Sequence, residues 1–409
     1  MMAVRLLWLV PATEVGLMLY LIWTRTPDVP MVDEWFLVET VRRWREGTLD
    51  LAHLLSFHNE HRIFIPRVIS LAVIQATDWH RQIWMTVNVI IAIATFGFFL
   101  QAFRRSLRDT LLTSAVAVAL AIVFFAPSQK YNYLMPFQTA FFSTIFGVAL
   151  THWATATGRP IALPFTGALI ATLSTAGGLM VWPAYAVTIW QRSKPAFAAW
   201  CATGAISTAL YFSPKPVTKA VHIFDPIRNV LFSLAFIGAP LGFPDPIIAM
   251  VFGAAGLAAL AIYTAAVARH GDNEASMLPW LCLAAFVLLN AGITSYGRLM
   301  AGYGLAMSPY RQAFSLLFWM ALIVIAAIAL ARHAMRRMLI ALPLAIFTAA
   351  FVRSAYVAYT TWDVDNQVRQ QNCIVEWEAC PPEVRYIFTY RSPPYPEFLR
   401  EQRLSIFRH

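Results

Sequence analysis

Long apolar runs recur along the chain and are separated by short polar segments. A helix that spans a bilayer needs roughly 20 consecutive apolar residues. Runs of about this length lie near residues 4–23, 83–102, 110–126, 135–156, 195–212, 246–268, 276–293, 313–331 and 338–356. Two shorter runs stand back to back within 161–190, around Gly177 and Gly178. The pattern predicts an all-α fold, a polytopic transmembrane bundle of about eleven spans.

Composition agrees with this prediction and excludes a soluble protein. Of the 409 residues, 59% are hydrophobic and 13% are charged. The interior of a soluble domain of this length could not hold so much apolar surface. The net charge of +10 would suggest a nucleic-acid partner in a soluble protein, but here the basic residues stand mainly in short loops, so we expect none. The run from Val4 to Trp23 is long enough to span and is interpreted as the first transmembrane helix rather than a cleaved signal.

The basic loops predict the orientation of the chain. Cytoplasmic loops are enriched in Lys and Arg. The candidate cytoplasmic loops are Arg104–Arg108, Gly158–Arg159, Gln191–Lys194, Arg269–His270 and Arg332–Arg337. All of them fall on one side if the N-terminus is cytoplasmic and the C-terminus is extracytoplasmic. Because arginine supplies most of the basic charge, as in many GC-rich bacterial genomes, we expect a multi-pass protein of a bacterial inner membrane.

The same argument makes residues 24–82 the first extracytoplasmic loop of a transmembrane domain that covers residues 1–356. Its apolar stretch Ile63–Ala76 must stay outside as a juxtamembrane helix, because a crossing there would place the loop at Arg104 on the wrong side. Phe36–Trp44 has apolar residues at helical spacing, which predicts an amphipathic helix on the membrane surface.

Residues 357–409 form a small extracytoplasmic C-terminal segment, the only polar segment long enough for a soluble unit. It contains Cys373 and Cys380, which could pair in an oxidising compartment. The sequence leaves their pairing open, because it does not define their geometry.

Adjacent carboxylates, Asp33 and Glu34, follow the first span almost immediately. Desolvating carboxylates at the boundary between membrane and water is costly, and a base is held there when its substrate is also there. We therefore predict that these two residues are catalytic. The alternative is a solvated pair of loop carboxylates.

A second cluster combines His58, Glu60, His61 and Arg62 just before the juxtamembrane helix. Its spacing matches no helical zinc signature, so a divalent metal is the lesser alternative. The favoured interpretation is that these polar side chains line one side of a substrate site. Arg62 or Arg67 would contact an anionic group, and the histidines would hydrogen-bond to hydroxyl groups.

A third outer segment carries Tyr131, Asn132 and Gln138. Aromatic faces with neighbouring amides suit a sugar ring, whose C–H faces stack and whose hydroxyls need partners. Tyrosines at the membrane interface also act as ordinary anchors, which is the alternative here.

A late segment places Arg298, Tyr310 and Arg311 near the outer ends of adjoining spans. A guanidinium at membrane level needs a countercharge, and a phosphate fits its planar donor fork. Snorkelling to lipid phosphates is the alternative. Between these segments, the Gly177–Gly178 hairpin breaks the helical pattern at membrane depth, which is tolerated only where it is buried or lines a cavity.

Together, the early acidic pair, the juxtamembrane helices, the glycine-broken hairpin and the late Gly-Arg segment resemble the GT-C superfamily of integral membrane glycosyltransferases. The resemblance implies a polyprenyl-phosphate-linked sugar as donor and an extracytoplasmic glycan, lipid or protein as acceptor. It implies Asp33 as the base, Glu34 as its neighbour or substitute, and Arg298 and Arg311 as ligands of the leaving phosphate. Pro309 departs from the family pattern, where an arginine often stands between Ser and Tyr, and this weakens the role of Arg311 more than that of Arg298.

Two other function classes fit parts of the pattern. A lipid-linked glycan polymerase or ligase would also bind a polyprenyl carrier through paired arginines, but it would not depend on Asp33. A transporter or flippase would also contain broken helices around a cavity. Such proteins usually show internal repeats, and none is apparent in this sequence.

Overall fold

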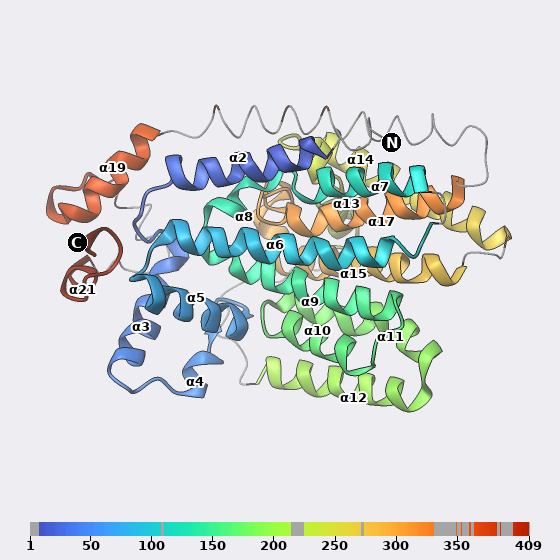
Figure 1. Cartoon of the computed structure of the whole chain (residues 1–409), viewed down its shortest axis with the longest axis horizontal. Coiled ribbons are helices and arrows are strands. Elements are labelled where there is room, and N and C mark those ends of the chain that lie inside the picture. The colour runs from blue at the N-terminus through green and yellow to red at the C-terminus, as the bar shows by residue number, and fades with distance from the viewer. Residues whose placement is uncertain are drawn as a thin grey trace.

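The computed structural model describes residues 8–107, 110–213, 225–270, 274–330, 364–382 and 396–408, together with residues 349, 353, 360 and 385. Most of the longer helices run along the long axis of the molecule and form a bundle (Figure 1). They are α2 (Leu9–Arg25), α6 (Arg81–Phe103), α7 (Thr110–Phe124), α9 (Thr139–Ala156), α12 (Lys194–Tyr211), α13 (Pro226–Gly242), α14 (Pro246–His270), α15 (Glu274–Arg298) and α17 (Gln312–Leu330).

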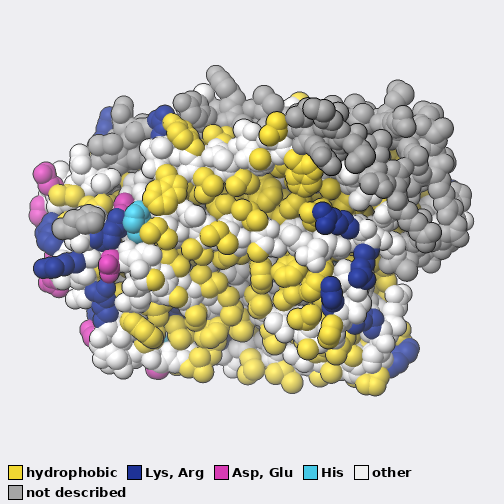
Figure 2. All heavy atoms as spheres, viewed as in Figure 1, with side chains coloured by type: hydrophobic (Ala, Val, Ile, Leu, Met, Phe, Trp, Pro, Cys, Tyr) yellow, Lys and Arg dark blue, Asp and Glu magenta, His cyan; other side chains and the backbone are white. Residues whose placement is uncertain are grey.

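Five of the described helical stretches are long and apolar enough to cross a membrane. They are Arg81–Phe103, Leu112–Leu134, Pro246–Arg269, Ser276–Ala301 and Gln312–Leu330. Apolar side chains cover much of the middle of the visible face, and charged side chains gather at its ends (Figure 2). The all-α class is thus confirmed, and these helices support the prediction of a membrane-embedded protein. The predicted number of about eleven spans stays a prediction, and the run at 338–356 lies almost entirely outside the described residues.

The glycine hairpin is formed by α10 (Ala162–Thr172), the 3-10 helix η4 (Ala176–Met180) and α11 (Val181–Arg192). Trp182 Nε1 donates a hydrogen bond to Thr172 Oγ1 at 2.9 Å across the turn. A Cβ on Gly178 would stand 1.9 Å from the Ala171 carbonyl oxygen, so only glycine fits there. The two predicted short runs are therefore helices folded back on each other, as the sequence indicated.

Helix α13 was not predicted from the sequence. It is 17 residues long, contains Pro240 and packs against α14 over most of its length. A Cβ on Gly238 would stand 1.8 Å from the Ala249 carbonyl oxygen, and one on Gly253 would stand 2.1 Å from the Leu234 oxygen. Small residues at a helix interface allow such close backbone approach. Helix α13 is shorter than the roughly 20 apolar residues that a spanning helix needs, so its apolar run alone does not predict it.

Short elements of the first loop cover one end of the bundle. They are η1 (Val32–Phe36), α3 (Leu37–Arg45), α4 (Leu51–Leu54), β1 (Phe57–His58), β2 (His61–Arg62) and α5 (Phe64–Thr77). Strands β1 and β2 pair antiparallel, with His58 opposite His61. The predicted amphipathic and juxtamembrane helices correspond to α3 and α5. Further short helices are η2 (Pro127–Gln129), α8 (Lys130–Leu134), η3 (Pro136–Gln138), η5 (Leu299–Ala301) and α16 (Tyr303–Ala306).

The C-terminal segment packs against this first loop. Its described elements are α19 (Val364–Val375), η6 (Trp377–Ala379), α21 (Pro396–Glu401) and η7 (Ser405–Phe407). Leu399 and Leu404 are buried in one hydrophobic cluster with Trp35 and Trp79 of the first loop. Arg408 forms an ion pair with Asp28 at 2.5 Å. The described part of the segment thus shares a hydrophobic cluster with the first loop.

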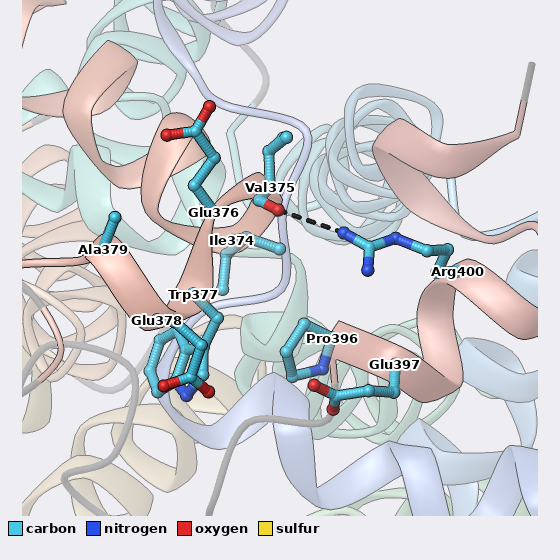
Figure 3. A pocket seen from close by; sticks show the side chains of 9 residues that line it. All are labelled: Ile374, Val375, Glu376, Trp377, Glu378, Ala379, Pro396, Glu397 and Arg400. Atoms are coloured by element: carbon cyan, nitrogen blue, oxygen red, sulfur yellow. Dashed lines mark hydrogen bonds between the residues drawn. The ribbon is translucent and has the colours of Figure 1, made fainter.

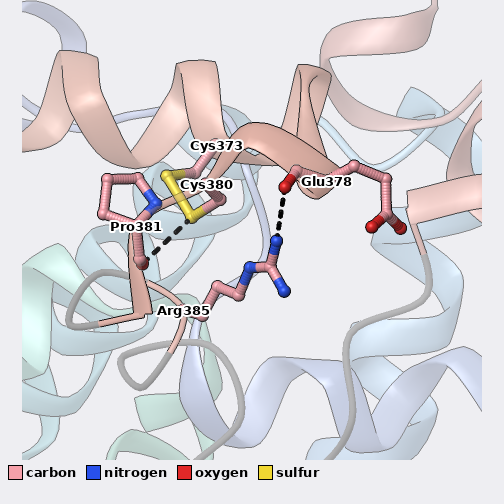
Figure 4. The surroundings of a disulfide bond; sticks show 5 residues. All are labelled: Cys373, Glu378, Cys380, Pro381 and Arg385. Carbon is pink, nitrogen blue, oxygen red and sulfur yellow. Dashed lines mark hydrogen bonds between the residues drawn. A yellow bond between two sulfur atoms is a disulfide. The ribbon is translucent and has the colours of Figure 1, made fainter.

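A disulfide between Cys373 and Cys380 closes the turn after α19, with the Cα atoms 4.7 Å apart (Figure 4). The Arg385 guanidinium donates to the Glu378 carbonyl oxygen at 2.7 Å beside it. The sequence left this pairing open. A disulfide is typical of an oxidising compartment, and this one lies in the same hydrophobic cluster as residues of the first loop.

Basic side chains gather at the opposite end of the bundle. Arg105 Nη1 donates to the Thr157 carbonyl oxygen at 2.9 Å, and Arg192 Nη2 donates to the Arg159 carbonyl oxygen. Three of the predicted basic loops therefore lie together. In the face shown by Figure 2, basic side chains stand there without acidic ones, whereas the end with the first loop carries both signs.

Candidate functional site

Asp33 lies in the first turn of η1, a few residues after α2 ends. Its side chain is 21% exposed, and its Oδ1 atom is 3.6 Å from Nε2 of His58. His58 is buried and packs against the rings of Phe36 and Phe137, with centroids 4.6 Å and 4.9 Å away. A partly exposed carboxylate beside a held imidazole is suited to accept a proton from a bound hydroxyl group.

Glu34 has a different environment from Asp33, although the two are adjacent. It is fully buried, and its two carboxylate oxygens accept hydrogen bonds from Nε and Nη2 of Arg81, both at 2.8 Å. Burial raises the pKa of the Glu34 carboxyl, and the Arg81 guanidinium opposes that rise. This bidentate pair ties η1 to the start of α6. The geometry therefore gives Glu34 a structural position rather than the catalytic one expected from its place in the sequence.

The tight turn between β1 and β2 brings together three parts of the chain. Glu60 forms an ion pair with Arg298 at the end of α15. His61 lies with its Nε2 3.8 Å from Glu60 Oε1, and its Nδ1 accepts a hydrogen bond from the Ala176 N–H at 3.3 Å. Of the predicted site residues, Asp33, His58, Glu60, His61 and Arg298 therefore meet at one corner of the molecule.

Arg62 and Arg67 were expected to contact an anionic group, but both donate to backbone carbonyls. Arg62 donates to the carbonyl oxygens of Leu55, Tyr211 and Ser213. Arg67 is fully buried and donates to the carbonyls of His53 and Leu54 at 2.7 and 2.6 Å.

Burial lowers the pKa of Arg67 to about 10. A guanidinium donates hydrogen bonds but accepts none, so the donors bonded to carbonyls are no longer free for a ligand. These bonds hold the first loop in shape, whereas Nε and Nη2 of Arg67 are buried and have no hydrogen-bond partner among the described residues. The predicted contact with an anionic group stays a prediction.

The remaining predicted residues form a second group. The amide of Asn132, from α8, donates to the Tyr310 carbonyl oxygen at 3.2 Å, and Tyr131 is 38% exposed. Arg311 Nη1 donates to the Tyr310 hydroxyl, to Ser308 Oγ and to the Leu305 carbonyl oxygen within 2.8 Å. These bonds hold the loop before α17.

The second group adjoins the first through one short segment. Phe137 of η3 contacts His58, and Phe141, shortly after it in α9, contacts Tyr310 with ring centroids 5.8 Å apart. Gln138 lies between them and is 9% exposed, and its Oε1 has no hydrogen-bond partner among the described residues.

Metal ligation has no geometric support in the described part of the chain. There, no group of three or more His, Cys, Asp or Glu side chains is placed to hold a metal ion. His58, Glu60 and His61 lie on the two strands of one hairpin, but His58 faces Asp33 while His61 faces the hairpin turn at Ala176.

Sequence reasoning overlooked buried polar residues within α9 and α15. Asn290 is 3% exposed in α15 and faces Gly177, and Thr144 Oγ1 lies 3.0 Å from Thr175 Oγ1. Asn290, Thr294 and Arg298 recur every four residues, which places them on one helix face. This spacing is the sequence signal that points to Asn290 and Thr294.

A hollow of about 330 Å³ lies elsewhere, in the C-terminal segment between η6 and α21 (Figure 3). Glu376, Glu378, Glu397 and Trp377 line it, and Arg400 donates across it to the Val375 carbonyl oxygen at 3.0 Å. None of the predicted site residues lines this hollow. The corner around Asp33 remains the candidate site on chemical grounds.

Comparisons with protein-family models, curated proteins and solved structures find no match to this chain.

Proposed function

We propose that the protein is a membrane glycosyltransferase that moves a sugar from a polyprenyl-phosphate donor to an extracytoplasmic acceptor. The observation that carries the proposal is that Asp33 and Arg298 each contact a residue of the β1–β2 hairpin. Asp33 lies beside His58. Glu60, two residues after His58, forms an ion pair with Arg298. A base and a phosphate-binding cation near one another are what a transfer from a lipid phosphate requires.

The proposed chemistry is a single displacement at the anomeric carbon. The Asp33 carboxylate takes the proton of the acceptor hydroxyl, and the acceptor oxygen forms a bond to the anomeric carbon. The bond from that carbon to the phosphate oxygen breaks, and polyprenyl phosphate leaves with the electron pair. Arg298 exchanges Glu60 for the phosphate and stabilises its charge. One displacement inverts the anomeric configuration.

The proposal includes the orientation in a bacterial inner membrane. The end with the first loop and the disulfide would face the extracytoplasmic side, and the end with Arg105, Arg159 and Arg192 would face the cytoplasm. The clustering of basic loops and the disulfide at opposite ends both favour this orientation. A polyprenyl-phosphate donor would then reach Asp33 from the outer leaflet.

The test is transfer of labelled sugar from a short-chain polyprenyl-phosphate donor by purified protein. Asp33→Asn removes the base, and we expect it to lower the transfer rate by about 100- to 10,000-fold while donor binding persists. Asp78→Asn is the matched control. Asp78 is exposed in the same outer layer and has a left-handed backbone with φ of 49°, which asparagine tolerates.

Three outcomes separate the function classes. Loss of transfer in Asp33→Asn alone supports the glycosyltransferase. Full activity in Asp33→Asn contradicts the role of Asp33 as base and favours a polymerase or ligase. Failure of the wild type to bind or consume any donor across a panel of sugars contradicts the proposal and favours a transporter.

A further inference from the structure

A polar stripe runs down one face of α15 from the candidate site into the bundle. Arg298 pairs with Glu60 at the outer end of this helix. Thr294 is one turn below it, and its Oγ1 donates to Oδ1 of Asn290 at 3.4 Å. Eight residues separate Asn290 from Arg298, so it lies about 12 Å deeper along the helix. The stripe therefore connects the outer corner with the interior at membrane depth.

The amide nitrogen of Asn290 is buried and has no hydrogen-bond partner among the described residues. The side chain is 3% exposed. The bond from Thr294 orients the amide so that Nδ2 points at Gly177, where a Cβ atom would stand only 2.4 Å away. Leaving a buried amide unpaired is unfavourable, and a bound ligand that supplies an acceptor would remove this cost.

The surroundings of Asn290 connect it to the candidate base. Gly177 belongs to η4, and the preceding residue, Ala176, donates its N–H to His61. His61 is the strand partner of His58, which lies beside Asp33. The turn between α10 and α11 thus contacts both Asn290 and His61, and His61 belongs to the corner around Asp33.

We propose that Asn290 is a ligand-binding residue whose amide donates hydrogen bonds to an oxygen of the lipid-linked donor. The inference rests on the proposed function and deepens it, because it adds a specificity residue within the same site. An amide N–H donates equally well to a phosphate oxygen and to a sugar hydroxyl. The shared chemistry is an oxygen acceptor, and because Gly177 has no side chain, the amide can lie against η4.

The experiment measures the affinity of purified protein for two probes, a short-chain polyprenyl phosphate and the same lipid carrying a sugar. Asn290→Leu removes both donors but keeps a similar volume. We expect its dissociation constant to rise about 10- to 100-fold, as for loss of one or two strong hydrogen bonds. Its thermal midpoint is expected to stay equal or to rise, because an unpaired amide is replaced by an apolar group. Leu289→Ala, at a neighbouring position that is 38% exposed, is the control.

The two probes distinguish the sources of the oxygen. If Asn290→Leu lowers the affinity for both lipids equally, the amide binds the phosphate. If it lowers the affinity for the sugar-bearing lipid alone, the amide binds a sugar hydroxyl group. Unchanged affinity in Asn290→Leu, with a wild type that binds and transfers, overturns this inference and leaves the proposed function intact. A wild type that binds neither lipid overturns both.

A second variant covers the case in which Asn290→Leu does not fold. Thr294→Val removes the hydroxyl that orients the amide, and we expect a smaller rise in the dissociation constant, about threefold to tenfold. An affinity equal to that of the wild type in this variant also counts against the role of Asn290.

Discussion

Neighbouring residues of the same type can have opposite roles when their partners differ. Asp33 is partly exposed beside an imidazole, whereas Glu34 is fully buried against Arg81. Two charges taken out of water are tolerated because each oxygen has a donor from the guanidinium. The pair is therefore sensitive to the loss of either partner, whereas an exposed ion pair such as Arg43–Glu39 contributes little.

We predict that Arg81→Met destabilises the protein by about 3–5 kcal/mol, because it leaves the Glu34 carboxylate buried without a countercharge. Burial raises the pKa of Glu34, so the folded state holds its proton more tightly than the unfolded state does. The contribution of the Glu34 carboxyl to the free energy of unfolding is therefore present at low pH and is lost as pH rises. The thermal midpoint of Arg81→Met should lie closer to that of the wild type at pH 5 than at pH 8.

The control is Arg43→Met, which removes an ion pair with exposed partners and should change stability by less than about 1 kcal/mol. The double variant Arg81→Met, Glu34→Leu should recover part of the loss, because no unpaired charge remains. Equal destabilisation of Arg81→Met at both pH values would show that the charge of Glu34 is not the cause.

At the scale of elements, the glycine hairpin is the part on which the site depends most. Helices α10 and α11 fold back through η4, whose Ala176 and Gly177 contact His61 and Asn290. The turn approaches the backbone of α10 so closely that Gly178 has no room for a side chain. A shift of this turn would move both the histidine and the buried amide.

We predict that Gly178→Ala lowers stability by about 1–3 kcal/mol or more, because its Cβ would stand 1.9 Å from the rigid Ala171 carbonyl oxygen. Gly97→Ala in α6 is the matched control. Nothing lies within 4 Å of a Cβ there, so the change should be neutral or stabilising by about 0.5–1 kcal/mol. Thermal unfolding of the two purified variants, in the same detergent, tests the pair. Similar thermal midpoints for Gly178→Ala and Gly97→Ala would mean that the turn between α10 and α11 can shift to accommodate the added methyl group.

At the scale of the whole molecule, the first loop and the described part of the C-terminal segment form one layer at one end of the bundle. Trp35 and Trp79 of the loop are buried with Leu399 and Leu404 of the segment. The Ser405 N–H donates to the Asp78 carbonyl oxygen at 2.8 Å, which fastens the end of the chain to the loop. This layer lies at the opposite end from the basic loops, so the molecule has two chemically different ends (Figure 2).

We predict that a membrane-impermeant maleimide labels Glu397→Cys in right-side-out spheroplasts and labels Arg104→Cys only after permeabilisation. Both residues are exposed, at opposite ends of the bundle. The experiment needs a background in which the exposed Cys201 is replaced by serine. The reverse pattern would invert the proposed orientation, and labelling of both positions in intact spheroplasts would contradict a membrane-embedded bundle.

The sequence by itself determined the features that depend on local composition. Apolar runs predicted most of the helices, and the paired runs at 161–190 predicted the hairpin, because a helix that faces lipid must satisfy its backbone internally and carry apolar side chains. Basic loops were predicted to share one side, and three of them lie together.

Only the tertiary structure decided which polar groups are engaged and which remain available. Glu34 and Arg81 are 47 positions apart, and the donors of Arg62 reach carbonyls about 150 positions away. No local pattern records such pairings, so Asp33 and Glu34 were indistinguishable in the sequence. For the same reason the sequence does not single out Asn290. It is one polar residue in an apolar span, and only the tertiary structure packs Gly177 against it. Long-range packing, rather than residue type, determines which side chains are free to do chemistry.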